Sequence, residues 1–450
     1  MSVPAADPLM PIREGLSLSR WQQLLLIVRM SVPCVLSMLS VFVMEAVDAS
    51  MLGHLSTNAS ASVGLVAIPT WFFYGMISAV SLGFNVQIAQ ALGAKKNALA
   101  RGLFKLALAG TQIFALTLTL LGLAVAPFLP EWLGGNAEIL GDATVYFLIF
   151  VLSVPLLQIT SLATGTLQSN GNAVLAGTLN IVMCVLNVLF NFLFIFVWGW
   201  GVAGAAFGTA LAELVAAGTA LFFIWGRLPT LALRARERFL FEKRRLWRAV
   251  KISAPVAFES LCMNSAYIAM IVIVAPLGSV AIASNSFGIT IESFCFMPGY
   301  GLAQTATAII GVCIGAKRVR LAQNLGWICV ALGVGLMSFS GVLVYFFAPW
   351  LISLLSPDKA VQALGTEILR IEAFAEPLYA ASIIAVGVMR GWGKTLVPAV
   401  INFASMWIVR IPLAIALVGS MGLRGVWIAM AVELCVRGLA QLGNLKLSKN

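Results

Sequence analysis

Apolar residues fill long continuous runs along most of this chain, and short polar or basic segments separate the runs. A run of about 20 apolar residues is long enough to cross a bilayer as an α-helix. The pattern therefore predicts an all-α polytopic membrane protein with about twelve spans, expected at 31–53, 61–90, 103–129, 141–163, 174–197, 203–225, 251–277, 282–313, 322–349, 365–388, 396–418 and 424–445. Ahead of the first span, residues 17–29 are expected to form a short interfacial helix.

Composition agrees with this class, because 61% of the residues are hydrophobic and 10% are charged, far from the mix of soluble domains. All seven cysteines lie within apolar runs, so we expect them in the core or facing lipid and not in a disulfide framework. With a single histidine and no catalytic or metal-ligand spacing, no enzyme site is recognisable. We therefore expect a membrane protein that is not an enzyme and that needs no cofactor.

The basic residues collect on one side of the predicted spans. They occupy the N-terminal segment, the turns near 95 and 317, the 226–251 loop with Arg234, Arg236 and Arg238, and the tail with Lys446 and Lys449. By the positive-inside rule both termini are expected in the cytoplasm. The net charge of +11 is then accounted for by topology and anionic lipid headgroups, and a nucleic-acid partner is not expected.

An internal repeat relates the two halves of the chain. A shift of 222 residues pairs Pro33 with Pro255, Gly93-Ala94-Lys95 with Gly315-Ala316-Lys317, Ala126-Pro127 with Ala348-Pro349, Pro155 with Pro377, Gly165 with Gly387 and Asn180 with Asn402. Beyond these residues the offset slips slightly, so that Glu213 pairs with Glu433. The repeat predicts two six-helix lobes of the same orientation, with the chain divided into 1–30, 31–225 (N-lobe), 226–250 (inter-lobe loop), 251–445 (C-lobe) and 446–450.

The repeated Gly-Ala-Lys triplets are expected to end a helix on the cytoplasmic side, with the glycine as the turn residue. The proline pairs are expected to kink their helices. Features that both halves share are interpreted here as structural.

Function is expected where the halves differ. Four polar residues of the first half are aligned with apolar residues of the second half at the repeat offset: Asp48 (Met270), Asn187 (Val409), Asn191 (Leu413) and Thr209 (Ala429 or Met430). By helical spacing Asn180, Asn187 and Asn191 share one face, and Glu45 shares a face with Asp48. Unpaired amides are costly in an apolar medium, so this stripe must face a partner or a hydrated cavity. A hydrogen-bond network that only fastens helices together is the alternative.

The remaining intramembrane charges lie mainly in the second half. Glu433 and Arg437 have the spacing of a self-neutralising pair on one helix, and Arg410 requires a carboxylate from another helix, with Glu376 as one candidate. Glu259, Glu292 and Glu376 are candidate C-lobe sites for a cationic substrate or a proton.

An ordered set of motifs resembles the multidrug and toxic compound extrusion (MATE) transporters over nearly the whole chain. The set comprises Pro33 with VDASMLG (47–53), QALGAKK (90–96), TGTLQSNGN (164–172), LNVLFNF (186–192), GVAGAAFGTALAE (201–213), GVCIGAKR (311–318) and VGVMRGWGK (386–394). The resemblance implies two six-helix lobes in a V and export of organic cations in exchange for H⁺ or Na⁺. It places the coupling-ion site on Asp48, Asn187, Asn191 and Thr209, with Glu45 and Asn180 as candidate support.

The same resemblance implies a monomeric antiporter of a bacterial-type plasma membrane, with lipophilic or cationic drugs as substrates and lipids around it. Many relatives carry a carboxylate where this chain has Asn191. A lipid or lipid-linked oligosaccharide flippase of the related fold remains the alternative function, although the intramembrane charges here are mainly acidic and a phosphate cargo favours a cationic cavity.

Overall fold

The computed structural model describes residues 7–228, 230–232 and 242–447, and these residues form helices and turns without a strand. Eleven of the described helices are long and apolar enough to cross a membrane, and a bent helix pair makes a twelfth span. The polytopic all-α fold predicted from the apolar runs is thereby confirmed. The loop arginines Arg234, Arg236 and Arg238 and the tail residue Lys449 lie outside the described residues.

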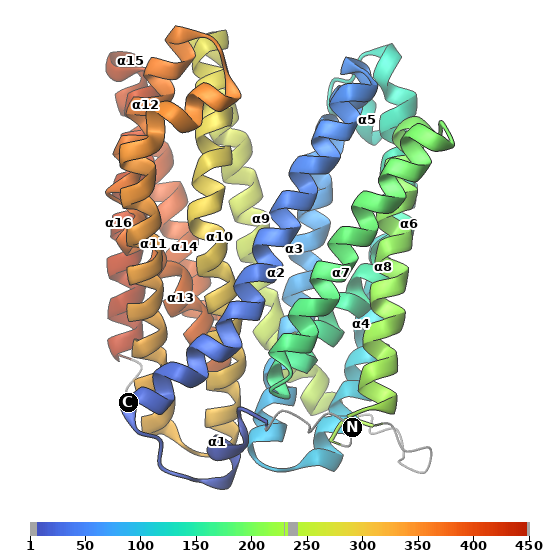
Figure 1. Ribbon diagram of the computed structural model, residues 1–450, viewed down its shortest axis with the longest axis vertical. Helices are drawn as coiled ribbons and strands as arrows, with labels where there is room; N and C mark the ends of the chain where they lie inside the picture. The colour runs from blue at the N-terminus through green and yellow to red at the C-terminus, as the bar shows by residue number, and fades with distance from the viewer. Residues whose placement is uncertain (1–6, 229, 233–241, 448–450) are drawn as a thin grey trace. The chain divides into compact units, whose positions relative to one another are not determined.

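The chain divides into two compact units (Figure 1). Unit 1 contains the residues up to Ser17, Leu36–Ala257 and Gly311–Arg318. Its helices are α1 (Met10–Glu14), α3 (Thr57–Gly93), α4 (Asn97–Val125), α5 (Leu129–Trp132), α6 (Ala137–Ser169), α7 (Ala173–Phe192), the π-helical η1 (Leu193–Val197) and α8 (Gly201–Gly226).

Unit 2 contains Leu18–Val35, Phe258–Ile310 and the residues from Val319 onward. Three helices contribute residues to both units: α2 (Arg20–Leu55), α9 (Lys243–Val274) and α10 (Ser279–Gly315). The other elements of unit 2 are the 3₁₀ turn η2 (Ala275–Leu277), α11 (Val319–Leu355), α12 (Lys359–Ala373), α13 (Glu376–Trp392), α14 (Leu396–Ala404), the π-helical η3 (Ser405–Arg410), α15 (Ile411–Met421) and α16 (Leu423–Leu447).

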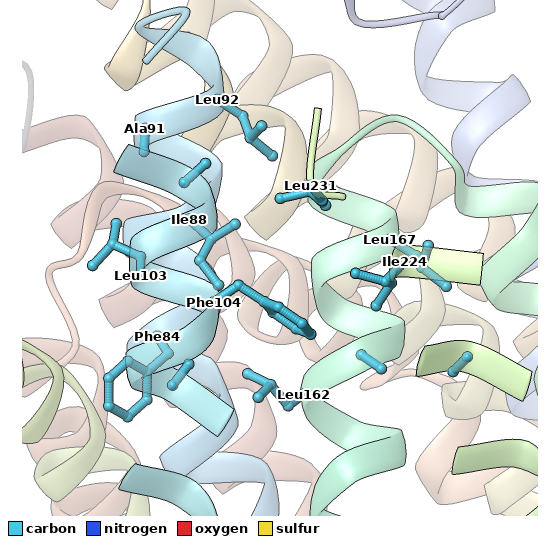
Figure 2. Close-up of a cluster of buried hydrophobic side chains, with 14 of the residues drawn as sticks. Phe84, Ile88, Ala91, Leu92, Leu103, Phe104, Leu162, Leu167, Ile224 and Leu231 are labelled. Carbon is cyan, nitrogen blue, oxygen red and sulfur yellow. The ribbon is translucent and has the colours of Figure 1, made fainter. Parts of the chain in front are cut away.

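In unit 1, α6 is the central helix, because α3, α4 and α8 all pack against it. Figure 2 shows one apolar cluster that joins these four helices. Phe104 of α4 is fully buried there between Ile88 of α3 and Leu162 and Leu167 of α6. In unit 2, α13 packs against α11 and α16 in the corresponding way.

Two local predictions were wrong. No separate interfacial helix covers residues 17–29, because α2 starts at Arg20 and continues to Leu55 with Pro33 inside it. In the Gly-Ala-Lys triplets the left-handed residues are Lys95 and Lys317, both at φ 58°. The glycines serve a close backbone crossing instead: a Cβ on Gly93 would overlap the Val312 carbonyl of α10, and one on Gly315 would overlap the Gln90 carbonyl of α3.

The predicted span 365–388 is not one continuous helix. It is divided into α12 and α13, which meet at Phe374 and Ala375 with a bend of 56°. Pro377 lies in the first turn of α13, where its missing N–H is tolerated. Pro33, Pro155 and Pro255 lie inside uninterrupted helices.

Candidate functional site

Three helices of unit 1 bring the four predicted site residues into one hydrogen-bonded chain. Asn191 Nδ2 on α7 donates to Asp48 Oδ1 on α2 at 2.8 Å and to Asn187 Oδ1 at 3.1 Å. Asn187 Nδ2 donates to Thr209 Oγ1 on α8 at 2.9 Å, and that hydroxyl donates to the Ala205 carbonyl at 3.1 Å. Two of the three amides inferred from helical spacing to share a face, Asn187 and Asn191, thus lie in one chain with the acid of the first span.

Asn187 and Asn191, the two asparagines of this hydrogen-bonded chain, are fully buried. Gly208 of α8 makes this packing possible, since a Cβ at that position would overlap Asn191 Oδ1. Among the described residues, Asn191 Oδ1 has no hydrogen-bond donor. A buried acceptor without a partner costs about 1–3 kcal/mol, so this oxygen is an available ligand beside the Asp48 carboxyl.

Further acidic and phenolic groups surround this chain. Glu45 lies near enough to Asp48 to interact electrostatically with it, and Tyr146 interacts with both. Glu213 of α8 is buried, and among the described residues its Oε2 has no hydrogen-bond partner. From the sequence, Glu213 was recognised only as the repeat partner of Glu433. The signal for a functional role was its position as an acid within the apolar run 203–225.

Asn180 does not join the Asp48 chain. Its Nδ2 donates instead to Ser37 Oγ at 2.8 Å. This bond also joins α7 to α2, but nearer to the N-terminal end of each helix than the Asp48 chain. The repeat partners of these two residues make the corresponding contact in unit 2, where Asn402 Nδ2 donates to Glu259 Oε1 at 2.5 Å. Asn180 therefore belongs to a contact between the first and fifth spans that both halves share.

Glu259 is held in a polar network. Besides Asn402 it pairs with Arg390 at 3.2 Å, and Gln441 of α16 donates to Asn402 Oδ1 at 2.9 Å. These bonds tie α9, α13, α14 and α16 together.

Glu292 of α10 and Glu376 of α13 lie together at the bend between α12 and α13, around a small cavity that Cys295 and Glu372 also line. Glu372 was not singled out from the sequence. The neighbouring Arg370 donates to the Tyr345 carbonyl at 3.3 Å. The four-residue spacing of Glu372 and Glu376 was the available signal.

Arg410 is not paired with Glu376. It donates two hydrogen bonds to Glu433 Oε2, from Nη2 at 2.7 Å and from Nε at 3.0 Å. Arg437 is 3.1 Å from the other oxygen of Glu433, as its helical spacing predicted. Glu433 is the better partner because it faces η3 from the adjacent α16, whereas Glu376 faces the bend.

The Asp48 chain offers carboxylate, amide and hydroxyl oxygens, which are hard ligands suited to H⁺ or to a small cation such as Na⁺. Among the described residues, no group of three or more His, Cys, Asp or Glu side chains is placed to hold a metal ion. The arrangement therefore offers oxygen ligands for one cation beside Asp48.

Comparison with known proteins agrees with these features. The protein-family model MatE matches residues 33–193 and 255–416. The probable multidrug resistance protein NorM of Thermotoga maritima is 26% identical over 417 residues, covering 88% of this chain and 86% of that protein. The uncharacterized transporter YisQ of Bacillus subtilis is 25% identical over 405 residues, covering 87% of each.

Solved structures share the fold. A MOP superfamily transporter from Pyrococcus furiosus, for which a binding pocket of reverse polarity is described, superposes with a TM-score of 0.91 at 18% identity, over 100% of this chain and 99% of that one. The Vibrio cholerae MATE transporter VcmN superposes with a TM-score of 0.89 at 20% identity, over 98% of each chain.

Proposed function

This chain belongs to the MatE family of multidrug efflux transporters, and from that membership we propose that it is an antiporter driven by H⁺ or Na⁺. Its substrates are organic, mainly cationic and amphipathic compounds. The observation that carries the proposal is the buried hydrogen-bond chain from Asp48 through Asn191 and Asn187 to Thr209.

The coupling ion acts at the Asp48 end of this chain. A charged carboxylate within a membrane span is costly unless it is paired, and the only hydrogen bond described for Asp48 comes from Asn191. A proton on Asp48, or a Na⁺ shared by Asp48 and the open Asn191 Oδ1, removes this cost. We infer that the site alternates between an empty, hydrated state and an ion-loaded, dehydrated state.

The hydrogen-bond pattern supports a route by which ion binding at Asp48 affects the packing of three helices, α2, α7 and α8. Asn191 donates to both Asp48 and Asn187 from one nitrogen, so an ion that draws Asn191 Oδ1 toward Asp48 changes both bonds. The change continues to Thr209 on α8 through Asn187. The first span then repacks against α7 and α8, and a bound lipophilic cation is displaced. No covalent step is involved.

We place the protein in the plasma membrane of a bacterial-type cell as a monomer, with both termini cytoplasmic. The lysine-rich turns at Lys95 and Lys317, which follow helices α3 and α10, support this orientation under the positive-inside rule.

The test is efflux of a cationic dye from proteoliposomes under a pH gradient or a Na⁺ gradient imposed separately. We expect Asp48→Asn to reduce ion-driven efflux to the level of protein-free vesicles, because the amide neither binds a proton nor supplies charge for Na⁺. The matched control is Asp142→Asn, which changes an exposed acid on α6 and should transport like the wild type.

Efflux by Asp48→Asn at the wild-type rate would refute the assignment. If dye efflux depends on neither the pH gradient nor the Na⁺ gradient, and the protein moves a labelled lipid across the bilayer, the result would favour the flippase instead. Which of the two gradients drives efflux identifies the ion.

A further inference from the structure

Glu213 of α8 is a buried acid that the proposed ion site does not use. It lies four residues after Thr209, whose hydroxyl ends the Asp48 chain. Residues four apart on a helix share a face, and four residues rise about 6 Å. Glu213 therefore lies on the same face of α8 as Thr209, one turn nearer to Gly226, where the helix ends.

The repeat partner of Glu213 is held very differently. In unit 2, Glu433 is paired with Arg410 at 2.7 Å and with Arg437 at 3.1 Å. The positions of the two arginines are apolar in unit 1, where they are Val188 and Ala217. Among the described residues Glu213 forms no ion pair, and its Oε2 is buried without a hydrogen-bond partner. Both halves keep the acid, but only unit 2 supplies a counter-charge.

Glu213 shares its surroundings with the acids of the first span. Tyr74 of α3 interacts electrostatically with Glu213, Glu45 and Asp48, and Cys184 of α7 interacts with the same three acids. Within the described parts of the chain, none of the three acids forms an ion pair. A carboxylate in a membrane span is costly without a counter-charge, and a charge on one acid opposes the ionisation of its neighbours. This region is therefore stable only when it also holds protons or other cations.

A stripe of buried polar side chains on α6 leads away from Glu213. Thr160 lies beside Glu213, and Thr164 and Gln168 follow it at four-residue steps. All three are buried, and their spacing places them on one face of the helix. Buried hydroxyl and amide groups one turn apart offer hydrogen-bond partners to water molecules along the way. The stripe reaches the end of α6, which contacts the basic N-terminal segment.

We propose that Glu213 is a second proton-carrying residue of unit 1, which releases its proton toward the cytoplasmic end of α6 when a cation neutralises Asp48. The inference rests on the proposed function for the part that Asp48 plays. While Asp48 is charged, the proton stays on Glu213, because two neighbouring carboxylates repel each other. When a cation occupies Asp48 this repulsion ends, the O–H bond of the Glu213 carboxyl breaks, and the proton passes to water along the α6 stripe. A carboxylate is left, and no electrons are transferred.

The groups packed around Glu213 come from several helices. Besides Asp48, the titratable groups of this region are Glu45 of α2, Tyr74 of α3, Tyr146 of α6 and Cys184 of α7. The π-helical η1, which also packs against α8, carries no titratable side chain. Glu213 therefore has acids and phenols as neighbours, and the state of Asp48 is the charge that changes during the proposed cycle.

The first test is infrared difference spectroscopy of the full chain in lipid nanodiscs while the pH is raised in steps without Na⁺. The spectra should contain a protonated-carboxyl band of one group that is absent in Glu213→Gln and unchanged in the control Glu131→Gln, an exposed acid on α5. In Asp48→Asn this band should disappear at lower pH than in the wild type, because no charge at residue 48 opposes ionisation. A spectrum without the band, or a band lost at the same pH in Asp48→Asn, would overturn the proposal.

A conservative variant separates a proton carrier from a structural acid. Under the gradient that drives the wild type, dye efflux from proteoliposomes should fall several-fold in Glu213→Gln and be largely restored in Glu213→Asp, which still carries a proton. Equal efflux by the two variants would contradict a proton role. If Glu213→Gln fails to fold, the band of Glu213→Asp, displaced in frequency from that of the wild type, still reports whether this acid titrates.

The route along α6 has its own matched pair of variants. Thr164 Oγ1 donates to the Thr160 carbonyl at 2.8 Å, and Thr144 Oγ1, near the other end of α6, donates to the Leu140 carbonyl at 2.8 Å. Replacement of H₂O by D₂O should shift the Glu213 band several-fold more slowly in Thr164→Val than in Thr144→Val. Equal exchange rates would contradict release along this stripe.

The outcomes distinguish this inference from the antiport proposal. If the Glu213 band titrates and responds to Asp48→Asn, but dye efflux depends on neither gradient, the antiport proposal alone fails. If efflux is ion-driven and is lost in Asp48→Asn, while Glu213→Gln transports like Glu131→Gln, the role of Glu213 alone fails.

Discussion

The fourth span of each half contains the same proline but takes a different shape. In unit 1, α6 runs unbroken from Ala137 to Ser169 with Pro155 inside it. In unit 2, the repeat partner Pro377 follows the break between α12 and α13, which are bent by 56°. A proline in a helix removes the hydrogen bond to the carbonyl four residues earlier and clashes with it. The difference must therefore arise from what surrounds that carbonyl.

A single hydroxyl distinguishes the surroundings of Pro155 from those of Pro377. The carbonyl deprived of its donor by Pro155 is that of Val151, and Thr119 Oγ1 of α4 donates to it at 3.1 Å. The repeat partner of Thr119 is Gly341, which faces the equivalent carbonyl, that of Ala373, without a donor. At this pair of positions, the half with a replacement donor keeps a continuous helix, and the half without one has the bend.

The shape of the helix then determines what lies beside it. Phe73 of α3 packs edge to face against Phe147 and Phe150 of α6, with ring centroids 5.8 Å and 5.9 Å apart. The repeat partners of these three rings are Cys295, Leu369 and Glu372, and they line the cavity at the bend. One half has an aromatic core where the other has a small cavity whose lining includes three glutamates.

The largest expected effect on stability is a difference between substitutions at Glu433 and at its repeat partner Glu213. Glu433→Gln leaves Arg410 and Arg437 buried without a counter-charge and should cost about 3–5 kcal/mol. Glu213→Gln removes no ion pair described here and should cost much less. Thermal unfolding of the purified protein in detergent measures both. Equal losses of stability in the two variants would contradict the stabilising role of the ion pairs that Glu433 makes.

A medium effect tests the explanation of the unbroken helix. Thr119→Val keeps the side-chain shape but leaves the Val151 carbonyl unpaired, with an expected loss of about 1–3 kcal/mol and faster hydrogen exchange around Pro155. In the matched control Thr117→Val, an exposed hydroxyl that bonds within its own helix to the Ile113 carbonyl is removed, and little change is expected. If both variants behave alike, the hydroxyl is not the reason that α6 is continuous.

The smallest effect concerns the contact that both halves share between their first and fifth spans. Ser37→Ala removes the neutral hydrogen bond to Asn180 and should cost about 1 kcal/mol. The control Ser40→Ala affects an exposed hydroxyl bonded to the Leu36 carbonyl. Chemical unfolding of the two variants side by side measures the difference. A larger loss in Ser40→Ala would contradict the importance of the shared contact.

Several features of this protein were determined by the sequence alone. The lengths of the apolar runs predicted the spans, because a membrane helix must satisfy its backbone internally and present about 20 apolar residues to the bilayer. The repeat then isolated Asp48, Asn187, Asn191 and Thr209 as the polar residues that only one half keeps. The structure joins these four in one hydrogen-bonded chain, while their role as the ion site stays a prediction.

Other features were decided only by the tertiary structure. The residue beside the carbonyl that Pro377 deprives of its donor is Gly341, which lies 36 positions earlier on another helix. The choice of Glu433 over Glu376 as the partner of Arg410 likewise depends on which helix faces η3. The role of Gly93 depends on the carbonyl of Val312. Helical periodicity shows which residues share a face, but it does not show which face of a distant helix lies opposite, and that pairing decides which polar atoms find partners.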